Sequence, residues 1–184
     1  EMYKIYFLLF ILLFASCSDE AQPKPKAYLS LKYPKKIYKK LALKRPYSFQ
    51  VLENTTLKDE ANNWLKIQYP NLKASLDITY RPVTNNLIEL LTEAEKLVFK
   101  HTVKAEQIIP KDFINKEYNV FGSVYDITGN AASQIQFHAT DSIKHFIKGS
   151  LYFYVKPNYD SLLPAIAYIK KDIVKILETL EWKE

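Results

Sequence analysis

The strongest constraint on the fold is the strict alternation in residues 72–80, whose sequence is LKASLDITY. Apolar or aromatic side chains occupy every second position, and polar side chains occupy the positions between them. Successive side chains of a β-strand point to opposite faces, so this pattern predicts a strand with one buried face. Residues 47–51 and 64–69 are weaker strand candidates, and Pro70 with Asn71 predicts a hairpin turn before residues 72–80.

Three further strands are predicted in residues 118–127, 133–140 and 145–155. The turn-forming sequences TGN (128–130) and TDS (140–142) separate them, so we expect an antiparallel meander. The middle strand carries a row of polar side chains that the alternation places on its outward face: Gln134, Gln136 and His138.

Two segments have apolar residues at helical spacing. The first is predicted to begin after Asn86, with Glu89 completing an N-cap signature, and Pro110 prevents its extension. The second has Ser161 as its predicted N-cap and Pro164 in its first turn. The apolar stripes are Leu87, Leu90, Leu91, Ala94, Leu97 and Val98 in the first helix, and Leu162, Ile166, Ile169, Ile173, Ile176 and Leu180 in the second.

These patterns predict one α+β domain in residues 46–184. A chain of 184 residues with 48% hydrophobic and 25% charged residues is expected to fold as a single globular unit. The expected architecture is an antiparallel sheet of about six strands with two main helices, most simply packed on the same face of the sheet.

The only cysteine, Cys17, follows an uncharged apolar run at residues 5–14. As a helix this run would be roughly 15 Å long, about half of a bilayer core, so it fits a signal peptide and not a retained membrane span. Ala15 and Ser16 provide the small side chains that precede the lipidated cysteine of bacterial lipoproteins. We therefore predict a lipoprotein signal peptide at residues 1–16 and lipidation of Cys17, the alternatives being a plain signal peptide or a buried N-terminal helix. An exported lipoprotein is not expected to bind nucleic acid.

Residues 17–45 are expected to connect the anchor to the domain. Residues 18–26 contain prolines and no large apolar side chain, which predicts an extended tether. Residues 32–46 are rich in lysine and contain no acidic residue. This basic arm could bind anionic lipid headgroups, but the simpler interpretation is a solvated extended arm whose charge promotes solubility.

The sequence contains no motif for catalysis or metal binding. The three histidines share no metal-ligand spacing, and the three glycines are too widely separated to form a phosphate-binding loop. We therefore expect no catalytic residue, metal or cofactor, and no enzymatic activity. The aromatic residues at 152–154 fit either a protein interface or packing on both faces of one strand.

One polar cluster is the only candidate for chemistry: Asp126, Asp141, His145 and Asp160. All four lie near predicted strand or helix ends, where turn and capping roles explain them more simply. If they met at one end of the sheet, they would form a polar groove or a cation site. That arrangement would favour an alternative function, a periplasmic ligand-binding domain or an enzyme acting on peptidoglycan.

The sequence also resembles the gliding motility lipoprotein GldD family. The resemblance lies in residues 129–173, including DSIKHFIKGSLYF and NYDSLLP, and in residues 24–34 and 85–105. It implies an outer-membrane lipoprotein of gliding Bacteroidota, required for gliding motility and the linked type IX secretion system. It also implies that partners are other lipoproteins and components of these machineries, and that Cys17 is the family's lipidated cysteine, acylated for example with palmitate. The C-terminal part looks similar to the PsbP/Mog1 fold.

The chain departs from the family pattern at two positions. Some relatives have cysteines where this chain has Arg45 and Asn63, so the disulfide that the resemblance implies for them cannot form here. Residues 18–20 (SDE) resemble the acidic signal that sends some lipoproteins of this phylum to the cell surface. We nevertheless expect the periplasmic face of the outer membrane.

Overall fold

The computed structural model describes residues 33–156 and 158–183, apart from the side chains of His101 and Thr102. The predicted signal peptide, Cys17 and the tether lie outside the described residues. Among the helices that are described, none combines the length and the apolar character needed to cross a bilayer.

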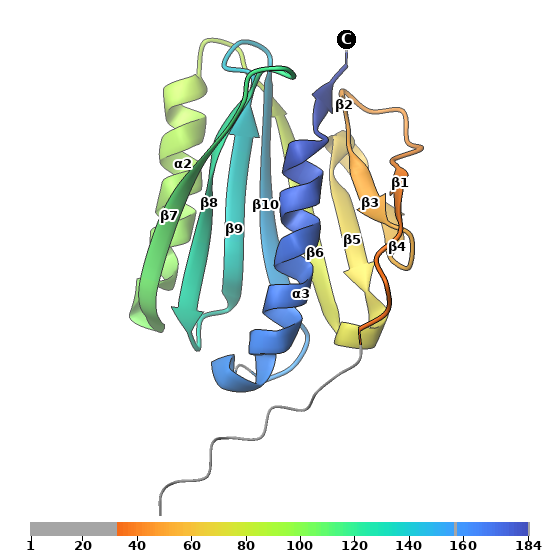
Figure 1. The fold of residues 1–184 in the computed structure, drawn as a ribbon. Coiled ribbons are helices and arrows are strands. Elements are labelled where there is room, and N and C mark those ends of the chain that lie inside the picture. The colour runs from red at the N-terminus through yellow and green to blue at the C-terminus, as the bar shows by residue number, and fades with distance from the viewer. Residues whose placement is uncertain (1–32, 157, 184) are drawn as a thin grey trace, which may run out of the picture. The chain divides into compact units, whose positions relative to one another are not determined.

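A seven-stranded antiparallel sheet dominates the domain (Figure 1). In spatial order its strands are β4 (Thr56–Asp59), β5 (Leu65–Tyr69), β6 (Ala74–Pro82), β10 (His145–Phe153), β9 (Ser133–Thr140), β8 (Val120–Gly129) and β7 (Ala105–Asn115). Two helices, α2 (Leu87–Phe99) and α3 (Tyr159–Glu178), pack against the sheet. The predicted α+β class and the meander that ends at β10 are therefore confirmed.

The predicted strand at residues 47–51 is the exception, because it lies outside this sheet. It forms two short strands, β2 (Tyr47–Ser48) and β3 (Gln50–Leu52). Strand β2 pairs with β11 (Glu181–Trp182), and β3 pairs with β1 (Tyr38–Lys40). Three 3-10 turns complete the described elements: η1 (Ala61–Asn63), η2 (Pro70–Leu72) and η3 (Lys100–Val103).

The two helices pack on opposite faces of the sheet, and not on the same face as predicted. In β10, Ile147 belongs to the cluster that includes α3, whereas its neighbour Phe146 packs against Leu90 and Ala94 of α2. Adjacent residues of a strand point to opposite faces, so α2 and α3 cover different sides (Figure 1). The face under α3 is already filled by α3 and the β2–β3 segment, so the other face is left for α2.

The position of α2 also corrects the prediction for β9. Gln134, Gln136 and His138 were expected to face solvent, but their exposed fractions are only 3–6%. They do point away from the main apolar cluster, as the alternation requires, yet α2 covers them. Strand β9 is therefore buried along its whole length on both faces.

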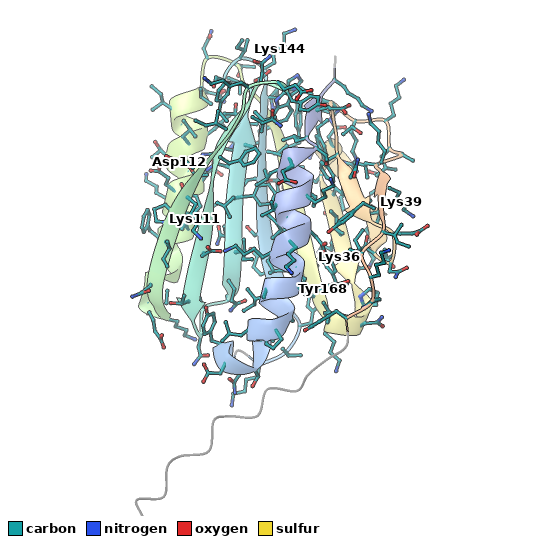
Figure 2. The ribbon with its side chains drawn as sticks, viewed as in Figure 1. Lys36, Lys39, Lys111, Asp112, Lys144 and Tyr168 are labelled. Carbon is teal, nitrogen blue, oxygen red and sulfur yellow. The ribbon has the colours of Figure 1, made fainter. Side chains whose placement is uncertain are left out.

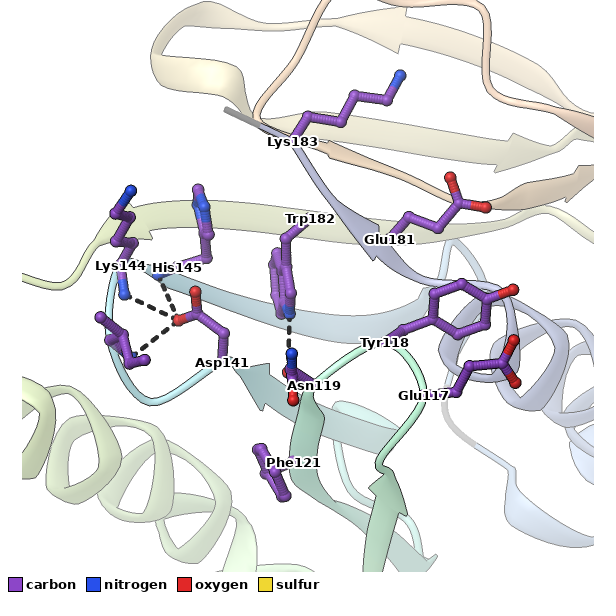
Figure 3. Close-up of a pocket in the computed structure, with 11 residues that line it drawn as sticks. Glu117, Tyr118, Asn119, Phe121, Asp141, Lys144, His145, Glu181, Trp182 and Lys183 are labelled. Carbon is purple, nitrogen blue, oxygen red and sulfur yellow. Dashed lines mark hydrogen bonds between the residues drawn. The ribbon is translucent and has the colours of Figure 1, made fainter.

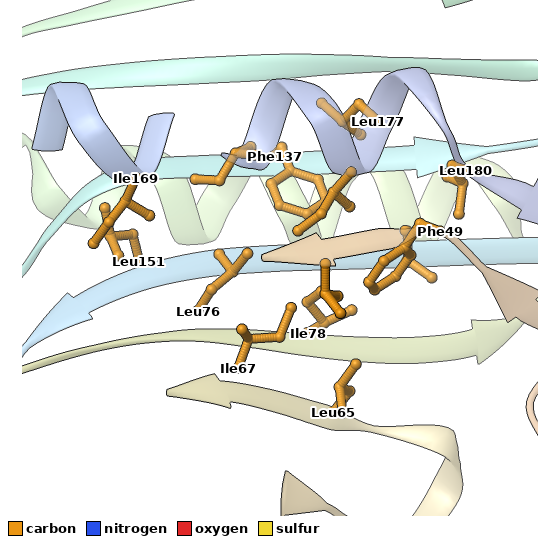
Figure 4. Packing of buried hydrophobic residues seen from close by; sticks show 14 of the residues in the cluster. Phe49, Leu65, Ile67, Leu76, Ile78, Phe137, Leu151, Ile169, Leu177 and Leu180 are labelled. Atoms are coloured by element: carbon orange, nitrogen blue, oxygen red, sulfur yellow. The ribbon is translucent and has the colours of Figure 1, made fainter. Parts of the chain in front are cut away.

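The main apolar core lies between the sheet and α3 (Figure 4). Leu76 and Ile78 of β6 and Phe137 of β9 contribute from the sheet, and α3 contributes the apolar stripe that the sequence predicted. Gly149 of β10 is needed here, because a Cβ at this position would lie 2.2 Å from the ring of Phe137. The alternation of residues 72–80 is thus explained by one apolar face packed under α3.

Residues 33–45 pack on the domain, although the sequence suggested a boundary at residue 46 and a solvated arm before it. We call residues 33–41 the strap. Strand β1 within the strap pairs with β3, and the backbone N–H of Leu41 donates to the carbonyl of Phe49 (2.8 Å). Leu41 is 3% exposed and Arg45 6%. Apolar and aromatic residues interrupt the pairs of lysines, and Tyr38 and Leu41 among them supply a buried side of the extended segment despite the high charge.

Arg45 and Asn63, where some relatives are expected to carry cysteines, are linked by a polar bridge. Arg45 forms an ion pair with Asp59 and donates to the hydroxyl of Tyr47 (3.2 Å). That hydroxyl donates to the backbone carbonyl of Asn63 (2.7 Å). Burial raises the pKa of Tyr47 to about 12, although the guanidinium of Arg45 acts to lower it, so the hydroxyl remains a hydrogen-bond donor.

The helix starts agree only partly with the sequence. Asn86 is the N-cap of α2, but its side chain makes no capping hydrogen bond to the helix. Helix α3 begins at Tyr159, and its N-cap is Asn158, which accepts from the N–H of Ser161 (3.3 Å). The prediction of Ser161 as N-cap was therefore wrong, because an asparagine is available three residues earlier and accepts from the backbone of Ser161 itself.

Strand β7 was not predicted. It is the edge strand of the sheet, and most of its residues are exposed, so its sequence shows no apolar alternation. Pro110, which was interpreted only as a helix breaker, lies within this strand opposite Tyr125 of β8. A proline is tolerated at a sheet edge because an edge strand has a neighbour on one side only.

Candidate functional site

A groove lies at one end of the sheet, where three segments meet (Figure 3). The segments are the β7–β8 turn, the β9–β10 turn and β11. We call this pocket of about 750 Å³ the end groove. It is lined by Glu117, Tyr118, Asn119, Phe121, Asp141, Ile143, Lys144, His145, Glu181, Trp182 and Lys183.

Asp141 is held inside the β9–β10 turn. Its Oδ1 accepts from the backbone N–H groups of Ile143 (2.9 Å), Lys144 (2.8 Å) and His145 (2.8 Å) (Figure 3). Partial burial acts to raise the pKa of Asp141, but these backbone hydrogen bonds outweigh it and lower the pKa below the ordinary value. The carboxylate therefore stays charged and stabilises a turn in which Ser142 has a φ of 67°.

His145 does not form a catalytic pair with Asp141, because their hydrogen bond uses the backbone N–H of His145. Its imidazole Nδ1 lies 3.0 Å from the hydroxyl of Tyr80, and its ring stacks on Trp182 with ring centres 5.2 Å apart. Burial lowers the pKa of His145, against the opposing charge of Asp141. The ring therefore contributes to the groove as a largely neutral aromatic surface at neutral pH.

The other two members of the predicted polar cluster lie outside this groove. Asp126 of β8 accepts from Lys170 of α3 (2.6 Å) and pairs with Lys111 of β7 (3.2 Å). Asp160 lies in the first turn of α3. The structure thus brings Asp141 and His145 together but separates Asp126 and Asp160 from them. Within residues 33–156 and 158–183, no group of three or more metal-ligating side chains is found.

The end groove combines exposed aromatic and apolar surface with a charged rim. Trp182 is fixed by a hydrogen bond from its Nε1 to the carbonyl of Asn119 (3.1 Å). Ile143 is 73% exposed and Tyr118 37%. Charged residues of both signs line the groove: Glu117, Lys144, Glu181 and Lys183. Such a surface suits contact with another protein.

A second cluster was missed by the sequence analysis. Asp172 of α3 is 1% exposed, and its Oδ1 accepts from Lys36 (2.5 Å) and from the hydroxyl of Tyr38 (2.7 Å). The ammonium group of Lys36 also lies 3.8 Å from the ring centre of Tyr168. Burial lowers the pKa of Lys36, although Asp172 acts to raise it, and burial together with Asp172 raises the pKa of Tyr38.

The sequence contained a signal for this cluster. Asp172 is three residues after Ile169 and four before Ile176, so helical spacing places it on the buried stripe of α3. A charge on an apolar stripe requires a partner, and the basic arm offered lysines that had no assigned role. The cluster holds the strap against α3, as the positions of Lys36 and Tyr168 in Figure 2 illustrate.

Comparison with known proteins gives one family. A family model described as gliding motility lipoprotein GldD matches residues 18–182. Neither curated proteins nor solved structures give a match, so the likeness to the PsbP/Mog1 fold remains a prediction. Because the family model covers nearly the whole chain, the chain belongs to the gliding motility lipoprotein GldD family.

Proposed function

We propose that the protein is an accessory lipoprotein of gliding motility and of the linked type IX secretion system. In this proposal the lipidated Cys17 anchors it on the periplasmic face of the outer membrane. The domain acts by binding other lipoproteins and components of these machineries, and it carries no catalytic activity. The family match supports the motility role, and the end groove supports the binding role.

The observation that carries the binding role is the exposed apolar surface of the end groove. Ile143 is 73% exposed in the β9–β10 turn, and its backbone N–H donates to the carboxylate of Asp141, which stabilises this turn. Trp182 is fixed by stacking and by its hydrogen bond to Asn119. Fixed aromatic anchors with a polar rim are typical of the residues that dominate binding energy in protein interfaces.

The alternative of an enzyme or ligand-binding domain depended on four side chains meeting in one pocket. The end groove contains only Asp141 and His145 of that set, and both have structural partners in it. No observation on the described residues favours this second function over protein binding.

The first test is site-specific photocrosslinking in the native membrane. A photoreactive amino acid at position 143 should capture a defined motility or secretion component. The matched control is position 103, because Val103 is also exposed (89%) and lies at η3, away from the end groove. Capture at position 103 but not at 143 would show that the end groove is not the binding surface.

The second test measures gliding. The substitution Ile143→Glu should abolish the crosslink and impair gliding while the purified domain keeps its melting temperature, because the side chain is exposed. Val103→Glu should leave gliding unchanged. Normal gliding of the Ile143→Glu strain, with the protein present at its usual level, would argue against the end groove.

A further inference from the structure

We propose that the strap is a membrane-docking surface, in which lysines bind anionic lipid headgroups and Ile37 inserts among them. The proposal rests on the proposed lipid anchor, because the anchor places the strap close to a bilayer. It assigns a role to Lys35, Ile37 and Lys39, which are exposed and do not pack on the domain.

The strap presents its residues alternately to the domain and to solvent. Lys36 and Tyr38 contact Asp172, whereas Lys35, Ile37 and Lys39 between and beside them are exposed. Ile37 is 60% exposed, although it stands in an extended segment that has a buried side available for apolar groups. An exposed isoleucine between two exposed lysines is an arrangement that suits the boundary of headgroups and acyl chains.

Some lysines in and next to the strap have no ion-pair partner in the described residues. Within the described part of the chain, Lys35, Lys39 and Lys44 form no ion pair, whereas Lys40 is paired with Glu181 (2.8 Å). The neighbouring acidic residue is Glu53, whose N–H donates to the carbonyl of Ile37 (2.8 Å). The net charge of the patch is therefore positive, as an anionic surface requires.

The patch is held in place before any membrane contact. Strand β1 pairs with β3 over Tyr38, Lys39 and Lys40, and the buried Asp172 fixes Lys36. Figure 2 places Lys39 at the edge of the domain and Lys36 beside α3. A preformed surface loses little conformational freedom on binding, which favours docking.

The chain length between the anchor and the strap permits this contact. The residues between Cys17 and Tyr33 can span at most ~55 Å when fully extended, so the described domain begins within reach of the bilayer that holds the anchor. The strap is the first part of the described domain after that anchor.

A fluorescence experiment on the lipidated protein tests the docking. Cys17 is the only cysteine, and its sulfur is blocked by lipidation, so Ile37→Cys introduces one free thiol for an environment-sensitive dye. The matched control is Ile114→Cys, because Ile114 is 62% exposed and lies on β7, an edge strand of the seven-stranded sheet, whereas β1 of the strap pairs with β3 outside that sheet. Both proteins are reconstituted into phosphatidylethanolamine vesicles with and without phosphatidylglycerol.

We expect the dye at position 37 to become brighter and blue-shifted only when phosphatidylglycerol is present, and this response to weaken with added salt. The dye at position 114 should not respond. Equal responses at both positions, no response at position 37, or a response that needs no phosphatidylglycerol would each overturn the proposal.

Charge-reversal variants separate docking from the anchor. In Cys17→Ser protein, which cannot be lipidated, Lys35→Glu with Lys39→Glu should weaken flotation with phosphatidylglycerol vesicles by roughly 20-fold or more. Lys104→Glu with Lys116→Glu, the same charge change at the two ends of β7, should have little effect; equal effects of the two pairs would overturn the proposal. Detergent-phase partitioning of the wild-type protein reports on lipidation separately, so a failed anchor and a failed docking surface give different results.

Discussion

The two faces of the central sheet are built differently. Under α3 the contacts are mainly apolar, with the buried Asp172 as a charged exception, and they join β5, β6, β9 and β10 to the stripe of α3 in one large cluster. Under α2 two small apolar clusters, centred on Phe146 and on Tyr125, flank a row of polar side chains from β9. Two atoms of this row, Gln134 Oε1 and His138 Nδ1, have no hydrogen-bond partner in the described residues, as is also true of Asp172 Oδ2 on the α3 side.

This difference indicates which part of the domain is rigid and which part opens more easily. The apolar clusters under α2 are much smaller than the cluster under α3, and a helix with few apolar contacts is held weakly. We therefore expect α2 to open before α3 does. The strap and β11, which contribute to the two proposed binding surfaces, both belong to the α3 side, and so these surfaces rest on the more stable half of the structure.

The largest expected difference between the faces comes from a matched pair of phenylalanines. Phe137 is 1% exposed on the α3 face, and Phe146 is 3% exposed on the α2 face of the adjacent strand. Phe137→Ala should lower the free energy of unfolding by about 3–5 kcal/mol, and Phe146→Ala by at least ~1 kcal/mol less. Urea denaturation measures both, and equal losses would show that the two faces are packed equally well.

A somewhat smaller effect is expected at the polar cluster of the α3 side. Asp172→Ala leaves the half-buried Lys36 without its counter-charge and should cost about 3 kcal/mol of stability. The control is the double substitution Lys36→Met with Asp172→Leu, which removes both charges and should restore most of the loss. If the double variant is as unstable as the single one, the strap is not held by this ion pair.

The polar row under α2 predicts a dependence of stability on pH. Burial lowers the pKa of His138 below 6.5, against the opposing charges of Glu95 and Asp112. Below pH 6.5 the unfolded chain therefore binds a proton that the folded chain resists, so the free energy of unfolding should fall as the pH drops through this value. At higher pH the contribution is constant.

The variant His138→Gln isolates this effect. His145 also has a lowered pKa, so the measure is the difference between wild type and variant at each pH, and not the slope of the wild type alone. We expect the wild type to lose more stability than the variant between pH 7 and pH 5, with hydrogen exchange increasing first in α2. Parallel curves for the two proteins would mean that His138 is not kept neutral by burial.

The two helices, β6 and the apolar stripe of α3 could be predicted from the sequence, whereas the burial of β9, the edge strand β7 and the packing of the strap could not. Apolar side chains recur at every second position in residues 72–80 and at helical spacing in α3. One side of each element is buried, and this burial gives rise to the pattern. In β9 both sides are buried, so the pattern of glutamines and a histidine looks solvent-exposed although it is not. Strand β7 lacks a buried face, and so its sequence has no period to detect.

The candidate sites show the same limit. The turn role of Asp141 followed from its local sequence, since its hydrogen bonds reach only as far as His145. The end groove required the C-terminal Trp182 to meet the turn at His145, and the strap required Lys36 to meet Asp172. Such contacts join residues far apart in the chain, and no local period encodes them.

The smallest predicted difference between the two sides lies at the helix starts. Asn158 caps α3 through Ser161, whereas the side chain of Asn86 accepts from Thr84 outside α2 (2.8 Å) and does not cap that helix. Asn158→Ala should therefore cost about 1 kcal/mol of stability. Asn86→Ala should cost ~0.5 kcal/mol or less, because the exposed N–H of Thr84 can donate to water when the side chain of Asn86 is removed. Urea denaturation of both variants measures the difference, and a larger loss for Asn86→Ala would mean that α2 is anchored at its start more firmly than its packing indicates.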